Sequence, residues 1–113
     1  MRVSEVLNLS GNFEGLQIVI EGIFIMEPGA GYFCEDIGDI ESRDRSILVD
    51  VPNLEARLLS CVPAYGGSKY SYCDQAKISG ALSSCHSRGF KFSIANVDSF
   101  VIYKHGNAIP VEI

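Results

Sequence analysis

The chain has 113 residues, 47% of them hydrophobic and 20% charged, with 9 Lys and Arg against 14 Asp and Glu and a net charge of −5. These values are typical of a single globular domain, residues 1–113, and exclude a disordered chain. The negative charge disfavours general binding to nucleic acids and favours encounter with a basic partner. No segment approaches the roughly 20 apolar residues that span a bilayer, and no signal-peptide pattern is present, so we expect a cytoplasmic protein without membrane contact.

The N-terminal half predicts a helix and then strands. Residues 2–8 place apolar side chains on one face of a short helix, with Ser4 as its expected N-cap. Residues 16–26 form a long apolar run rich in β-branched side chains, which predicts a long strand. Gly22 near its middle predicts a bulge or sharp bend, so that this strand takes part in both halves of a small closed sheet.

A turn at residues 27–31 leads to a second strand that we expect to begin at residues 32–34. The segment 35–45 holds five acids and two arginines and is too polar for a core, which predicts a solvated loop. Residues 46–51 predict a third strand that Pro52 ends, and residues 53–61 predict a short helix with Asn53 as its N-cap.

The second half continues with alternating segments. Tyr70 and Tyr72 have strand spacing, so both are expected to point to the same side. Residues 75–82 and 90–94 alternate apolar and polar side chains, which predicts an antiparallel pair joined by the loop 83–89. We expect the last strand to resume at 99–103 after a kink around 96–98. The predicted core covers about residues 13–103, with 1–12 and 104–113 peripheral and the C-terminal tail loosely held.

The count of five strand segments with a short helix between the third and fourth is the order of the OB-fold, a five-stranded Greek-key barrel. The segments 13–24, 47–50, 76–82 and 90–97 resemble small bacterial OB-fold-like proteins of largely unassigned function, in which a strand pattern of alternating hydrophobic residues followed by glycine recurs, as it does here before Gly22 and Gly80. The resemblance implies a mainly β, single five-stranded OB-like Greek-key barrel with one or two short helices. It implies no one function, because OB-like barrels bind nucleic acids, sugars and proteins alike.

The residues that carry chemistry are few. His86 follows Cys85 in the predicted hairpin, and neighbouring positions of an extended chain point to opposite faces, which is a poor arrangement for a thiolate and its base. No glycine-rich phosphate loop is present. We therefore expect a non-enzymatic protein without catalytic residues, metal or cofactor. Cys34, Cys61, Cys73 and Cys85 are expected to be buried, reduced thiols, and a disulfide or a zinc site with His86 is the alternative.

Two functional hypotheses follow, both for a binding module. In the first, an immunity or inhibitor type of protein neutralises a basic, toxin-like partner. Its candidate contact residues are the acids Glu35, Asp36, Asp39, Glu41 and Asp44 with the tyrosines Tyr32, Tyr65, Tyr70 and Tyr72.

In the alternative hypothesis the chain binds single-stranded nucleic acid, with aromatic rings that stack on bases and cations that follow the backbone. The candidate residues are Tyr32, Phe33, Tyr70, Tyr72, Lys77, Arg88 and Lys91. An oligomeric assembly factor or a small-ligand binder would have a similar sequence profile.

Overall fold

The computed structural model describes residues 1–9, 11, 13–64 and 69–113. The chain is mainly β, as the sequence predicts. Its strands are β1 (Leu16–Glu27), β2 (Ala30–Cys34), β3 (Ile47–Val49), β4 (Tyr72–Ser84), β5 (Phe92–Lys104) and β6 (Asn107–Pro110). Its helices are α1 (Val3–Leu7) and α2 (Leu54–Cys61), with the short 3-10 helices η1 (Ile37–Asp39) and η2 (Arg43–Arg45). No helix in the described part of the chain has the length and apolar content needed to cross a membrane.

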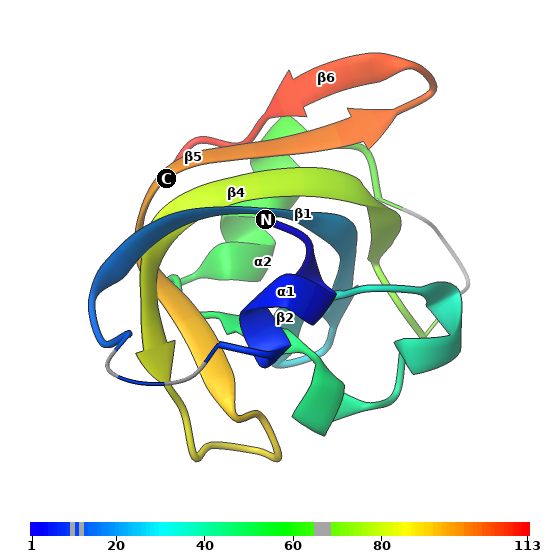
Figure 1. Cartoon of the computed structure of the whole chain (residues 1–113). Helices are drawn as coiled ribbons and strands as arrows, with labels where there is room; N and C mark the ends of the chain where they lie inside the picture. Colours follow the sequence, from blue (N-terminus) through cyan, green and yellow to red (C-terminus); the bar gives the residue numbers. More distant parts are fainter. Residues whose placement is uncertain (10, 12, 65–68) are drawn as a thin grey trace.

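The strands form one sheet in the order β3-β2-β1-β4-β5-β6 (Figure 1). Neighbours in this order are antiparallel. β3 and β5 also pair in parallel, and this pairing closes the first five strands into a ring. β1 pairs with β4 over residues 16–26 and with β2 over residues 23–27, so it takes part in both sides of the ring as predicted. Its β-branched side chains suit this double pairing because they are well accommodated on a pleated surface.

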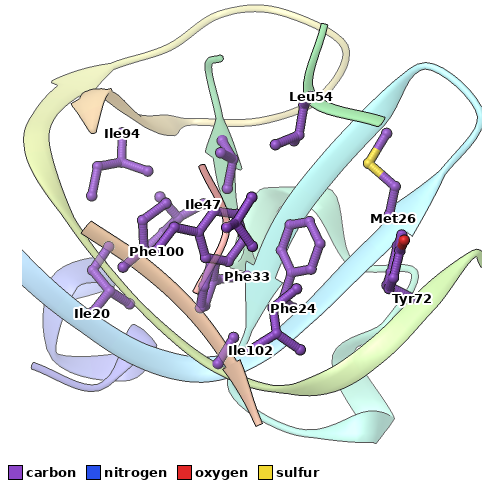
Figure 2. Packing of buried hydrophobic residues seen from close by; sticks show 14 of the residues in the cluster. Ile20, Phe24, Met26, Phe33, Ile47, Leu54, Tyr72, Ile94, Phe100 and Ile102 are labelled. Carbon is purple, nitrogen blue, oxygen red and sulfur yellow. The ribbon is translucent and has the colours of Figure 1, made fainter. Parts of the chain in front are cut away.

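One apolar core fills the inside of the ring. Alternate residues of β1, among them Ile20 and Phe24, point into this core, which follows from the two-residue period of a strand. The rings of Phe24, Phe33 and Phe100 meet at its centre with centroids 5.0 to 5.9 Å apart (Figure 2). Contacts between tilted aromatic rings at these distances add to the stabilisation that burial of the rings supplies. These ring contacts therefore connect β5 with β1 and β2, with which β5 shares no backbone pairing.

A second apolar cluster lies on the other face of β1, β2 and β3. Ile25, Tyr32 and Leu48 belong to it together with Phe90, and Ile40 of the segment 35–45 packs against it. Every residue of β2 is consequently buried. The segment 35–45 is therefore more than a solvated loop, because it also covers a face of the sheet.

The prediction of five strands is wrong by one, because the C-terminal tail contains β6. Its residues 107–110 pair with residues 101–104 of β5, and Val111 beyond them is buried. The tail is thus not loosely held. Its composition gave no strand signal because most of its side chains stay exposed, and the backbone pairing with β5 and the burial of Val111 order it.

Other local predictions were confirmed or corrected. The kink expected at residues 96–98 is a bulge within one continuous strand, with Asn96 at φ 49. α2 begins after Asn53 as expected, but the Asn53 side chain makes no capping hydrogen bond. The N-cap of α1 is Arg2 rather than Ser4. Gly22 was expected to mark a bulge or a sharp bend, and its pairing in register with Ala76 excludes the bulge.

The absence of a side chain at Gly22 serves a close approach between β1 and the end of β2. A Cβ atom there would lie 2.8 Å from the backbone carbonyl oxygen of Cys34 and 3.0 Å from Val3. A backbone oxygen in a sheet cannot move aside without cost, so this position excludes any larger residue.

We predict that Gly22→Ala lowers the free energy of unfolding by about 1–3 kcal/mol, because the added methyl group overpacks this contact. Gly38→Ala is the matched control, because a Cβ there meets nothing within 4 Å. We expect it to stay within about 0.5 kcal/mol of the parent. Urea unfolding followed by circular dichroism measures both, and equal values for the two variants would contradict the packing argument.

Candidate functional site

The segment 35–45, called the acidic segment below, has an ordered backbone. Within η1 the Asp39 amide donates to the Asp36 carbonyl at 2.9 Å, and the Ser42 amide then donates to the Asp39 carbonyl at 2.9 Å. The hydroxyl of Ser46 donates to the Ser42 carbonyl at 2.8 Å, which closes the end of the segment. These hydrogen bonds hold the backbone of the acidic segment in one conformation within the chain itself.

Tyr32 of β2 joins the acidic segment to the sheet. The buried Tyr32 hydroxyl donates to the Ile40 carbonyl at 2.7 Å. Burial, together with the negative charge of Glu27, raises the pKa of this phenol, so it stays a protonated donor at neutral pH. Tyr32 is therefore part of the support of the acidic segment.

Arg43 joins the acidic segment to two other loops. Its guanidinium lies 2.5 Å from the carboxylate of Glu27, next to the β1–β2 turn, and donates to the Arg88 carbonyl in the β4–β5 hairpin at 3.1 Å. It also lies over the ring of Phe90, 5.2 Å from the ring centroid. Because Glu27 is only 8% exposed, Arg43 also neutralises a largely buried carboxylate.

Several carboxylates of the acidic segment are engaged within the molecule. Glu35 forms an ion pair with Arg2 and accepts a hydrogen bond from the Ser4 amide at 2.7 Å, which ties the segment to α1. Burial alone would raise the pKa of Glu35, but the bonds from Ser4 and Arg2 outweigh it and hold the pKa below its ordinary value. Asp39 pairs with Arg45 at 3.4 Å.

Glu41 contacts residues that precede β4. It lies 3.2 Å from Lys69 and accepts a hydrogen bond from the Tyr70 hydroxyl at 3.3 Å. The hydrogen bond and charge of Lys69, with the bond from Tyr70, lower the pKa of Glu41. These contacts bring the acidic segment and the chain before β4 together.

The outward side of the acidic segment combines charge with an apolar side chain. Asp36 and Asp44 are exposed, and neither forms an ion pair with any residue that the structure describes. Ile37, next to Asp36, is 58% exposed. An exposed isoleucine next to the unpaired carboxylate of Asp36 resembles the centre and rim of a protein interface on a small scale.

Most of the predicted aromatic contact residues lie inside the molecule. Tyr32, Phe33 and Tyr72 are at most 1% exposed, and the Tyr72 hydroxyl donates to the Val62 carbonyl at 2.6 Å. Their rings present no surface to a protein or a base in this structure. Tyr70 is half-buried, and Tyr65 lies outside the described residues.

Tyr70 and Tyr72 do not share a side as the spacing predicted. Tyr70 packs against the second apolar cluster, whereas Tyr72 belongs to the core inside the ring. The two-residue period fails here because β4 begins only at Tyr72.

The predicted cations do not form one stripe. Lys77 lies on β4 and pairs with Glu21 of β1 at 3.5 Å. Arg88 and Lys91 lie in the β4–β5 hairpin, where the Arg88 side chain donates to the carbonyl of Gly29 in the β1–β2 turn. The cations therefore belong to separate regions of the surface, and only those of the hairpin lie near loops.

The cysteines are free thiols. Cys34 is buried and the other three are half-buried. Burial, with the negative charge of Asp39 nearby, raises the pKa of Cys34 to about 12, so this thiol stays protonated and unreactive at neutral pH. Cys85 packs against the second apolar cluster while His86 is exposed. Among the described residues, no three His, Cys, Asp or Glu side chains gather in a way that could hold a metal ion.

A cleft of about 400 Å³ lies between the β1–β2 turn, the end of β3 and the first turn of α2. The cleft exists because β3 pairs with β2 only at residues 47 and 48. Beyond them the chain stays paired with β5, where the backbone amide of Asp50 donates to the Ile94 carbonyl. Sequence reasoning missed this cleft. The only signal is Pro52, which marks the end of the strand but does not indicate where β3 leaves β2.

Comparison of the chain with protein-family models, with characterised proteins and with solved structures finds no match. A function must therefore be argued from the geometry of the acidic segment and of the cleft beside it.

We predict that Arg43→Ala lowers the free energy of unfolding by about 1–3 kcal/mol, since the largely buried Glu27 then keeps only the longer ion pair with the exposed Lys69, at 4.0 Å. Arg45→Ala is the control, because the Arg45 side chain is 64% exposed and pairs at the surface. We expect it to cost less than about 1 kcal/mol. Chemical denaturation measures the free energy of unfolding of both variants. An equal loss in the two would show that Arg43 does not stabilise the fold through Glu27 and Arg88.

The lowered pKa of Glu35 predicts a pH dependence. Because its pKa is lower in the folded chain than in the unfolded one, Glu35 stabilises the fold above its ordinary value of 4.5, and this contribution is lost as the pH falls through the folded pKa. We expect Glu35→Gln to cost up to about 1 kcal/mol at neutral pH, and this cost should decrease steadily as the pH falls below 4.5. Asp36→Asn, which removes an exposed carboxylate without an ion pair, should not show this difference in urea unfolding.

Proposed function

We propose that this chain is a non-enzymatic acidic binding module, built on an OB-type barrel, that binds a basic protein partner through the acidic segment. The order of pairings supports the barrel proposal. β1 to β5 form a ring in which β3 and β5 are parallel, and α2 connects β3 to β4, which fits a five-stranded Greek-key barrel of the OB type. In this proposal α1 and β6 are additions at the two ends of the chain.

The observation that carries the proposed function is the exposed Ile37 beside the unpaired carboxylate of Asp36, on a backbone that is already ordered. Interfaces combine an apolar centre with a polar rim, and a few central residues supply most of the affinity. An ordered segment loses little conformational entropy on binding. Unpaired carboxylates attract a basic partner and raise the association rate.

We further propose that the module is of the immunity or inhibitor type and neutralises a toxin-like basic partner in the cytoplasm. The net charge of −5 supports a basic partner. The free cysteines are typical of a reducing compartment. A chain of this kind acts by covering the functional surface of its partner, which needs no catalytic groups of its own.

Binding of single-stranded nucleic acid remains the second candidate, and one observation favours it. The β1–β2 turn and the β4–β5 hairpin meet where Arg88 donates to Gly29, and OB-folds hold oligonucleotides between these two loops. However, the rings of Tyr32, Phe33 and Tyr72 are buried and offer no stacking surface. The protein-binding proposal is therefore preferred.

The test uses the purified product of the neighbouring gene where that gene encodes a basic, toxin-like chain. We expect isothermal titration calorimetry to show tight binding that weakens at least tenfold with Ile37→Ala, or about 1.4 kcal/mol. Asp36→Lys with Asp44→Lys should weaken it further and slow association, because both attractive charges become repulsive. The thermal midpoints should stay close to that of the parent.

Asp98→Lys with Glu112→Lys is the matched control, since it makes the same change in net charge at exposed positions elsewhere. Its affinity should stay near that of the parent. Equal losses in the two double variants would show that only net charge matters, and would overturn the assignment of the acidic segment as the contact surface. Tight, salt-sensitive binding of a labelled oligothymidine would instead favour the nucleic-acid candidate.

A further inference from the structure

We propose that the cleft between the β1–β2 turn and α2 receives a lysine or arginine side chain of the basic partner. The inference rests on the proposed function and deepens it, because it names a second contact and the chemical group that fills it.

The cleft adjoins the acidic segment. Arg88 lines the cleft, and its carbonyl accepts a hydrogen bond from Arg43 of the acidic segment. Arg43 also pairs with Glu27, next to the turn whose residue Gly29 lines the cleft. One partner can therefore cover the acidic segment and reach the cleft without bridging a distant part of the surface.

The floor of the cleft suits a long side chain with an apolar stem. Its apolar lining includes Met26, Val49 and Leu54, from β1, β3 and α2. Lysine and arginine bury their methylene groups against such surfaces and keep the charged end near polar groups. The volume of about 400 Å³ lies near the lower end of ligand sites, roughly 300–1,000 Å³, which fits one side chain better than a large ligand.

The charges of the cleft favour a cation. Asp50 and Glu55 line it from the end of β3 and the first turn of α2. Neither carboxylate forms an ion pair with a described residue, and Glu55 accepts a hydrogen bond from the neutral Ser71 hydroxyl at 3.1 Å. The guanidinium of Arg88 donates to the Gly29 carbonyl and forms no ion pair with either carboxylate, so the charged lining residues Asp50, Glu55 and Arg88 leave a net charge of −1. An ammonium or guanidinium group that enters the cleft can form a charge-assisted hydrogen bond with a carboxylate of this lining.

The test is a titration of the ¹⁵N-labelled chain with N-acetyl-arginine amide, followed by heteronuclear NMR. We expect saturable shifts of the backbone amides of Gly29, Gly31 and Leu54, and smaller shifts with the uncharged N-acetyl-norleucine amide. Asp50→Asn with Glu55→Gln should weaken the response at least fivefold. Glutamine can still accept the Ser71 hydrogen bond, so the fold should be kept.

Asp36→Asn with Asp44→Asn is the matched control, and it should keep the shifts at the cleft. Three outcomes would overturn this inference. The arginine probe could shift only amides of the acidic segment, the norleucine probe could give equal shifts, or acetate could shift the cleft amides in place of the arginine probe. The first of these leaves the proposed function standing. If the cleft amides show saturable shifts but the chain binds no basic protein, the cleft is a site for cationic side chains and the proposed function is wrong.

Discussion

Burial of β2 on both faces is the constraint on which the arrangement of the surface depends. Phe33 points into the core inside the ring, while Tyr32 and Cys34 point the other way into the second apolar cluster. A strand that is apolar on both faces needs a cover on each side. The ring covers one face, and the acidic segment with the β4–β5 hairpin covers the other. A segment with five acids is therefore kept in place by an apolar surface beneath it.

This constraint divides the acidic segment into two sides. On its inner side, Ile40 fills the second cluster and Arg43 neutralises the largely buried Glu27. On its outer side, Asp36 and Ile37 face solvent. The inner contacts fix the positions of the outer groups, so the same bonds that stabilise the fold also preorganise the proposed contact surface. The electrostatic field outside the segment is weaker than five acids would produce. The reason is that Glu35, Asp39 and Glu41 each form an ion pair within the molecule.

The cleft arises from the same part of the topology. β3 must pair with β2 on one side and with β5 on the other, and it can follow both only for a short distance. Beyond Leu48 it stays with β5 and opens a gap beside the β1–β2 turn. The guanidinium of Arg43 donates to the carbonyl of Arg88, which lines the cleft, so the acidic segment is connected to the edge of the cleft.

The sequence by itself determined the mainly β class, the long first strand, the position of α2 and the irregularity at residues 96–98, because these depend on local periods and on β-branched or turn-forming residues. It could not determine that both faces of β2 are covered, because a two-residue period shows only that alternate side chains share a face. Tyr32 on β2 therefore looked available for binding, as did Tyr72 on β4, although both are buried. The pairing of β6, the joining of Glu27, Arg43 and Arg88, and the cleft were decided only by the tertiary structure. Each depends on contacts between residues distant in the chain, and no local pattern records such contacts.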